Sequence, residues 1–279
     1  MLVELRVLGT LSVRYNCVQA VPSARKPRQV LSLLMLSHGR VVPTSVLLAE
    51  LWGDLPPRSA VPTFQGYVCQ LRKSFALALG IPVMTVAESV LRTHGSGYSL
   101  AVAADTYFDL TEYRRLEAAA LRYFDARDDA EAVETADRAL ALWHGPALAD
   151  VAHGTVLAVE VAALEQARST LLECRMEARL RLGRHRESLS ELGALVMRDN
   201  YNENLNAQYM LALYRSGCRE RALSVYQRLR TTMVRELGLE PSPWLQRLHS
   251  ALIAADPRLD DRQAVWQGVV QASGTVASK

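Results

Sequence analysis

The chain has 279 residues, of which 49% are hydrophobic and 22% are charged, a composition typical of a globular protein with room for two domain cores. No apolar run approaches the roughly 20 residues of a membrane-spanning helix, and no export signal opens the sequence. We therefore expect a cytoplasmic protein without membrane contact. The four cysteines are widely spaced and have no histidine at ligand spacing, which argues against zinc and predicts reduced thiols.

The net charge of +3 is unevenly distributed along the chain. Residues 1–104 carry 10 Lys and Arg against 4 Asp and Glu, whereas the remaining residues carry 22 against 25. A basic block followed by an acidic one suggests a module that binds a polyanion, joined to a second domain.

The first block alternates short strands and helices. Apolar and polar residues alternate over Val3–Val7, Leu11–Tyr15 and Cys17–Val21, which predicts a small antiparallel sheet. Two helices are predicted next, at Pro27–Ser37 and Ser45–Trp52. A third helix after them would complete a helix-turn-helix, in which the last helix enters the DNA groove.

That third helix is predicted within residues 58–75. Its apolar side chains Phe64, Val68, Leu71 and Phe75 recur at helical spacing, and Ser59 is a candidate N-cap. Its other side offers hydrogen-bond donors, since Arg can fork onto guanine and Gln can pair with adenine. An ordinary amphipathic surface helix with a solvated basic face is the alternative. The residues on the polar side are Thr63, Gln65, Gln70, Arg72 and Lys73.

A glycine-rich hairpin is predicted directly after this helix. Val83–Val86 and then Leu91–Thr93 have strand composition, and a turn of the sequence His-Gly-Ser-Gly precedes Tyr98–Leu100. A hairpin behind a recognition helix is the layout of a winged helix-turn-helix. Arg92 and His94 would then contact the phosphate backbone, although a plain sheet edge remains the alternative.

These segments resemble a known family. The runs RVLGTLSVRY, GRVVPTSVLLAELWGDLPPRSA and LRTHGSGYSL are similar to the N-terminal domain of the Streptomyces antibiotic regulatory proteins, activators with an OmpR-type winged helix-turn-helix. One departure is Gly66, which lies on the polar side of the third helix. It either weakens the helix by about 1 kcal/mol relative to Ala or permits close approach of the backbone to DNA.

From Asp105 onward the pattern is helical almost throughout, with seven amphipathic segments. An internal repeat aligns LGRHRESLSEL at residue 182 with SGCRERALSVY at residue 216, an offset of 34, the period of tetratricopeptide repeats. The segments ALALWHGPALADVA and ELGLEPSPWLQRLHSALIAADP resemble the bacterial transcriptional activation domain of the same family. The resemblance covers about residues 1–257.

The predicted fold is mainly α. A winged helix-turn-helix DNA-binding domain (1–104) precedes an all-α activation domain of tetratricopeptide-like helices (105–257) and a flexible tail (258–279). We expect base edges to be read by Arg72, Thr63, Gln65 and Gln70. Phosphates would be contacted by Lys73, Arg58, Ser59, Lys26, Arg28, Arg92 and His94.

The resemblance implies an activator of an antibiotic or other secondary-metabolite gene cluster. It would bind direct repeats in double-stranded DNA near the promoter −35 element as a head-to-tail homodimer, and recruit RNA polymerase through its sigma factor and other subunits. The alternative is a tetratricopeptide-type adaptor or ligand sensor with weak DNA binding. We expect no enzymatic activity, cofactor or metal, because no phosphate-binding loop, nucleophile elbow or assembled set of catalytic residues is present.

Overall fold

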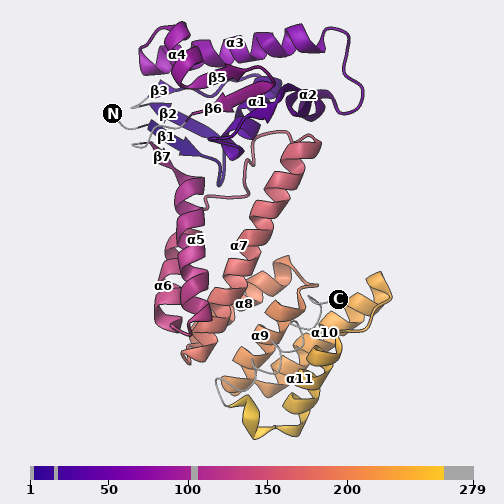
Figure 1. Ribbon diagram of the computed structural model, residues 1–279. Helices are drawn as coiled ribbons and strands as arrows, with labels where there is room; N and C mark the ends of the chain where they lie inside the picture. The colour runs from indigo at the N-terminus through magenta and orange to yellow at the C-terminus, as the bar shows by residue number, and fades with distance from the viewer. Residues whose placement is uncertain (1–2, 16–17, 102–105, 261–279) are drawn as a thin grey trace. The chain divides into compact units, whose positions relative to one another are not determined.

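The structure is a computed structural model that describes residues 3–15, 18–101 and 106–260 (Figure 1). The chain forms two compact units, each assembled from separate stretches of sequence. The first unit contains residues 1–117 and 138–169, and the second contains 118–137 and 170–279. Two predictions fall outside the described residues: the domain boundary between residues 104 and 105, and the part of the flexible tail at residues 261–279.

The first unit opens with a four-stranded sheet in the order β3-β2-β1-β7. The predicted antiparallel strands are present as β1 (Val3–Arg6), β2 (Ser12–Tyr15) and β3 (Val18–Gln19). Strand β7 (Tyr107–Phe108) adds a parallel edge to β1 and was not predicted. This pairing joins residues about 100 positions apart, so no local sequence pattern predicts it.

The second sheet has the order β4-β6-β5. Strands β5 (Leu91–His94) and β6 (Gly97–Leu100) form the predicted hairpin, and β4 (Val42–Pro43) pairs with β6. Gly97 is required at this junction, since a Cβ there would lie 2.0 Å from the Val42 carbonyl oxygen.

The three helices predicted for the helix-turn-helix are α1 (Arg25–Leu36), α2 (Thr44–Trp52) and α3 (Ala60–Leu79). Helix α1 is buried on most sides, as its run of leucines predicts. In Figure 1, α3 runs beside the β5–β6 hairpin. The unit also contains the first turns of α5 (Asp109–Asp125) and α7 (Thr155–Arg181).

The prediction of a strand at Val83–Val86 is wrong. Helix α4 (Val83–Ser89) occupies this segment. Only Val86 is buried, at 0% exposure, whereas Val83 and Met84 are exposed, so the side chains do not alternate as in a half-buried strand. Val86 packs within the first unit, and this tertiary contact outweighs the β-propensity of valine.

The second unit is helical in its described residues, and all seven predicted helices after residue 105 are present. They are α5, α6 (Asp129–Leu140), α7, α8 (His185–Arg198), α9 (Glu203–Arg215), α10 (Arg219–Leu237) and α11 (Pro243–Ala254). A short 3₁₀ turn, η1 (Pro257–Leu259), follows.

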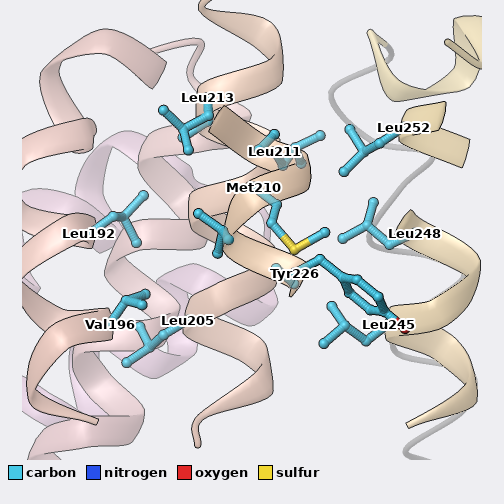
Figure 2. Packing of buried hydrophobic residues seen from close by; sticks show 14 of the residues in the cluster. Leu192, Val196, Leu205, Met210, Leu211, Leu213, Tyr226, Leu245, Leu248 and Leu252 are labelled. Atoms are coloured by element: carbon cyan, nitrogen blue, oxygen red, sulfur yellow. The ribbon is translucent and has the colours of Figure 1, made fainter. Parts of the chain in front are cut away.

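The predicted 34-residue repeat is visible in the packing. Met176 and Met210, which it pairs, are both fully buried, and Gly183 and Gly217 both have positive φ, at 81° and 84°. Figure 2 shows the core that these hairpins share with α11. Its labelled residues are Leu192, Val196, Leu205, Met210, Leu211, Leu213, Tyr226, Leu245, Leu248 and Leu252.

Candidate nucleic-acid interface

Helix α3 buries one row of side chains and exposes the opposite face. Phe64 and Leu71 have 0% exposure, and Val68 and Phe75 have 2% and 5%. On a helical wheel, Gly66 and the exposed Lys73 lie opposite this row. The predicted base-reading residues occupy the two edges of that outer face, with Thr63 and Gln70 on one edge and Gln65 and Arg72 on the other.

In this structure Arg72 is bound to the β5–β6 hairpin, which is the wing of the winged helix-turn-helix. Its Nε and Nη2 donate to the Leu91 carbonyl oxygen over 3.1 and 2.8 Å, and Nη2 also donates to Thr93 Oγ1 over 2.7 Å. Three of the five guanidinium donors therefore hold β5 against α3, and these bonds do not involve Nη1. Arg72 thus connects the helix to the hairpin whether or not it reads a base.

The wing presents Arg92 and His94 to solvent. Both lie on the same face of β5, because strand side chains alternate. His94 Nε2 is 2.8 Å from Ser99 Oγ on the neighbouring strand, which fixes the imidazole. At the tip, Gly95 is exposed and a Cβ there would meet no atom within 4 Å, so the tip leaves room for a phosphate backbone.

The other predicted phosphate contacts begin α1 and α3. Lys26 Nζ lies 4.3 Å from the centre of the Trp52 ring, and Trp52 stacks on Tyr67 of α3. Arg58 and Ser59 are exposed at the start of α3. Ser59 is the N-cap residue, as predicted, but its side chain makes no capping bond in this structure. Its hydroxyl can therefore turn toward a ligand.

Arg28 has a carboxylate partner within the protein. It forms an ion pair with Asp150, whose other oxygen accepts the Leu11 N–H over 2.8 Å. Arg28 would have to exchange this partner, wholly or in part, to contact a phosphate. Asp150 is one of three carboxylates that join the winged helix to the segments that follow it.

Glu50 of α2 is one of the two buried carboxylates among these three, with 3% exposure. Its Oε1 accepts the Gly154 N–H over 2.6 Å, and its Oε2 accepts the N–H groups of Val156 and Leu157 over 3.0 and 2.9 Å. It thus caps the N-terminus of α7, where free N–H groups favour a negative charge. Sequence reasoning missed Glu50, because its partners lie more than 100 residues away.

Asp109 makes an equivalent connection at the start of α5. Its carboxylate accepts the N–H groups of Val7, over 3.1 and 2.9 Å, and Leu8, over 3.0 Å. Burial raises its pKa to about 6, against the opposing effect of these hydrogen bonds. With Glu50 and Asp150 it forms what we call the carboxylate collar of the first unit.

The second unit has charge networks and a groove of its own. Arg175 and Arg179 of α7 each bridge Asp137 of α6 and Glu191 of α8. A groove of about 290 Å³ lies between α8, α9 and α10. Met197 is 78% exposed at this groove, and Arg228 also lines it.

Among the residues that the structure describes, no group of three or more His, Cys, Asp or Glu side chains is arranged to hold a metal ion. None of the helices in the same part of the chain is long and apolar enough to cross a membrane.

Comparison with known proteins identifies the family. The sequence profile of the bacterial transcriptional activator domain matches residues 108–253. The chain is 45% identical to the regulatory protein DnrI of Streptomyces peucetius, covering 92% of this chain and 94% of that protein. The chain belongs to the Streptomyces antibiotic regulatory protein (SARP) family of transcriptional activators. The predicted family membership is confirmed.

Two further relatives of this SARP are longer proteins, and the chain matches only part of each. The regulatory protein AfsR of Streptomyces coelicolor is 35% identical over 92% of this chain, which covers 25% of AfsR. The solved structure of EmbR from Mycobacterium tuberculosis in complex with a low-affinity phosphopeptide has a TM-score of 0.83 and 28% identity. That match covers 98% of this chain and 70% of EmbR. The predicted fold class, a winged helix-turn-helix followed by an all-α domain, is confirmed.

Proposed function

We propose that this SARP is a cytoplasmic, sequence-specific DNA-binding activator of a secondary-metabolite gene cluster. Family membership supports a role in transcription regulation. The observation that carries the DNA-binding part is the outer face of α3, which is exposed, bears Gln65, Gln70 and Lys73, and is tied by Arg72 to a hairpin whose tip is open. The proposal is supported because the candidate base-reading and phosphate-binding side chains lie on adjacent elements.

The base-reading set is Thr63, Gln65, Gln70 and Arg72. The two glutamines are exposed, so each can present its amide to an adenine edge. Arg72 would keep its Leu91 bond and offer Nη1, or release the wing and fork onto guanine.

A pair of variants separates these two roles of Arg72. Thr93→Val removes the hydroxyl that Arg72 Nη2 donates to and leaves the guanidinium intact, whereas Arg72→Ala removes both functions. If Arg72 reads a base, Arg72→Ala should weaken binding to the cognate site by about 1–3 kcal/mol more than binding to random DNA. Thr93→Val should weaken both alike. Equal losses on both DNAs for Arg72→Ala would refute base reading and leave only wing positioning.

The phosphate-contacting set is Lys73, Arg58, Ser59, Lys26, Arg92 and His94, with Arg28 after partner exchange. These contacts position the protein without reading sequence. Each cation that contacts a phosphate should contribute about one unit to the slope of log K against log salt. Arg92→Ala should therefore lower that slope by about one, while preserving the preference for the cognate site.

The resemblance further suggests direct repeats near the −35 element, bound by two copies arranged head to tail, and recruitment of RNA polymerase through its sigma factor and other subunits. A gel shift with promoter DNA from the gene's own neighbourhood tests the first part. A discrete complex that survives random competitor, with a footprint of two spaced repeats, is the expected result. Polymerase pull-down and in vitro transcription test recruitment.

Gln70→Ala provides a direct test of base reading by α3, with Gln227→Ala as the matched control. Gln227 is also an exposed glutamine on a helix, but lies on α10 in the second unit. Gln70→Ala should weaken cognate binding by about tenfold and leave random DNA unaffected. The control should bind both DNAs as the natural chain does. The proposal fails if the two variants behave alike.

The adaptor function is the second candidate, and the groove between α8, α9 and α10 favours it. It predicts weak, sequence-indifferent DNA binding together with strong capture of a protein partner. Diffuse, competitor-sensitive complexes in the gel shift would favour this candidate over the activator.

A further inference from the structure

A partly open cavity of about 130 Å³ lies in the first unit, between the N-terminal sheet and the last turns of α3. Val13 of β2 forms one wall, Phe75 and Ala78 of α3 form another, and Leu100 of β6 contributes a third. Each of these side chains is at most 6% exposed. The cavity is therefore an apolar space behind the helix that we propose reads DNA.

One residue that lines the cavity has a buried polar group. Tyr15 lines the cavity and is 8% exposed, yet its buried hydroxyl makes no hydrogen bond to any residue that the structure describes. The backbone at Tyr15 is held on both sides, because β2 pairs there with β1 and with β3. A buried hydroxyl without a partner is unfavourable, so an occupant that bonds to it would be stabilised.

We propose that this cavity binds a small neutral aromatic molecule, a single ring bearing one hydrogen-bonding group, of the phenol class. An apolar protein cavity of about 150 Å³ stays dry and accepts benzene, so the present volume suits one ring rather than two. The ring would contact Phe75 and Leu100, and its hydroxyl would bond to that of Tyr15. The lining is mainly apolar and its charged member, Arg14, is an exposed cation, so a positively charged ligand is disfavoured and a neutral ring matches the apolar walls.

Occupancy of the cavity is coupled to DNA binding. Phe75 and Ala78 follow Lys73 on the same helix, and Leu100 belongs to the wing strand β6. If DNA binding changes the spacing of these two elements, a ligand that contacts both has different affinities for the DNA-bound and DNA-free protein, and the effect is reciprocal. This part of the inference rests on the proposed DNA-binding function.

The first experiment titrates the full chain with phenol and with toluene, which has a similar ring but no hydroxyl. Binding is followed by calorimetry and by the shift in melting temperature, since a ligand of the folded state raises stability. Phenol should bind saturably with one site per chain and more tightly than toluene. Tyr15→Phe should still bind toluene, but should lose the preference for phenol.

A second variant blocks the cavity. Ala78→Leu fills it from α3 and should abolish saturable binding of both compounds, whereas the control Ala118→Leu, at an exposed position of α5, should bind them normally. Circular dichroism establishes that each variant is folded. Absence of saturable binding to the natural chain, or binding that survives in a folded Ala78→Leu chain, would overturn the site. An unchanged phenol preference in Tyr15→Phe would overturn the role of the hydroxyl.

The third experiment measures phenol affinity with and without saturating promoter DNA. We expect at least a threefold difference between the two dissociation constants, and equal constants would overturn the coupling. Failure of the proposed function is distinguishable, because it would appear as loss of specific DNA binding in the absence of phenol.

Discussion

Glu50 offers the sharpest test of how the winged helix is held. Its carboxylate is 3% exposed and accepts three backbone N–H groups at the start of α7. Glu50→Gln retains the shape, but an amide can present only one oxygen. If that oxygen keeps the bonds to Val156 and Leu157, the amide NH₂ faces the Gly154 N–H, and one charge-assisted bond becomes a donor–donor contact.

Losing a hydrogen bond to a charged group costs about 1.5–3 kcal/mol, so Glu50→Gln should lower the free energy of unfolding by about 2 kcal/mol. Glu50→Ala removes all three bonds and should cost about 4 kcal/mol, a large share of the stability of an ordinary domain. Urea unfolding followed by circular dichroism measures both. Hydrogen exchange at Gly154, Val156 and Leu157 shows whether the loss is local.

The control is Glu134→Gln, an exposed glutamate of α6, which should change stability by less than about 0.5 kcal/mol. A Glu50→Gln chain as stable as this control, with normal protection of the three amides, would refute the capping role. Glu50 would then be a buried carboxylate whose contacts add nothing net to the folded state.

Three further outcomes are expected. Gly97→Ala should destabilise the wing and abolish specific DNA binding in gel shifts, because its Cβ would lie 2.0 Å from the Val42 carbonyl oxygen. Gly95→Ala is the control and should leave stability and DNA binding nearly unchanged, because its Cβ would meet no atom within 4 Å. Gly66→Ala should raise the free energy of unfolding by about 0.5–1 kcal/mol, since its Cβ would meet no atom within 4 Å, and should weaken binding to cognate DNA. Unchanged binding would show that the α3 backbone does not approach DNA closely. The pKa of Asp109 is raised from 3.8 to about 6, so the folded state favours its protonated form. The free energy of unfolding should therefore fall as the pH rises from about 4 through 6, by about 3 kcal/mol at most. Urea unfolding should show the natural chain losing stability relative to Asp109→Asn over this range, and a constant difference would contradict the raised pKa.

The sequence predicted elements well wherever the pattern was local and repeated. Helix α3 follows from the spacing of Phe64, Val68, Leu71 and Phe75, and all four are buried. The repeat likewise placed Met176 and Met210 at equivalent, fully buried positions. Such patterns are readable because one face of each helix must leave water.

The failures have a different physical origin. The segment Val83–Val86 has strand composition, yet it lies in helix α4, of which Val86 is the buried residue. The pairing of β7 with β1, and the bonds of Glu50 and Asp109, join residues roughly 100 positions apart. In the candidate interface, the outward residues of α3 could be listed from the helical period. The bonds from Arg72 to Leu91 and Thr93, and the ion pair of Arg28, depend on tertiary contacts that no local spacing encodes.

The carboxylate collar has a consequence for exchanging parts between relatives. A recombinant chimera joined near residue 104 would supply Glu50, Val7 and Leu8 from one parent and their partners at 109, 154, 156 and 157 from the other. Because the first unit is completed only by residues 138–169, a transplant of DNA specificity should exchange the outward side chains of α3 and the wing within an otherwise intact parent. The proposed DNA specificity should therefore transfer better by exchanging single residues than by exchanging a contiguous segment of the gene.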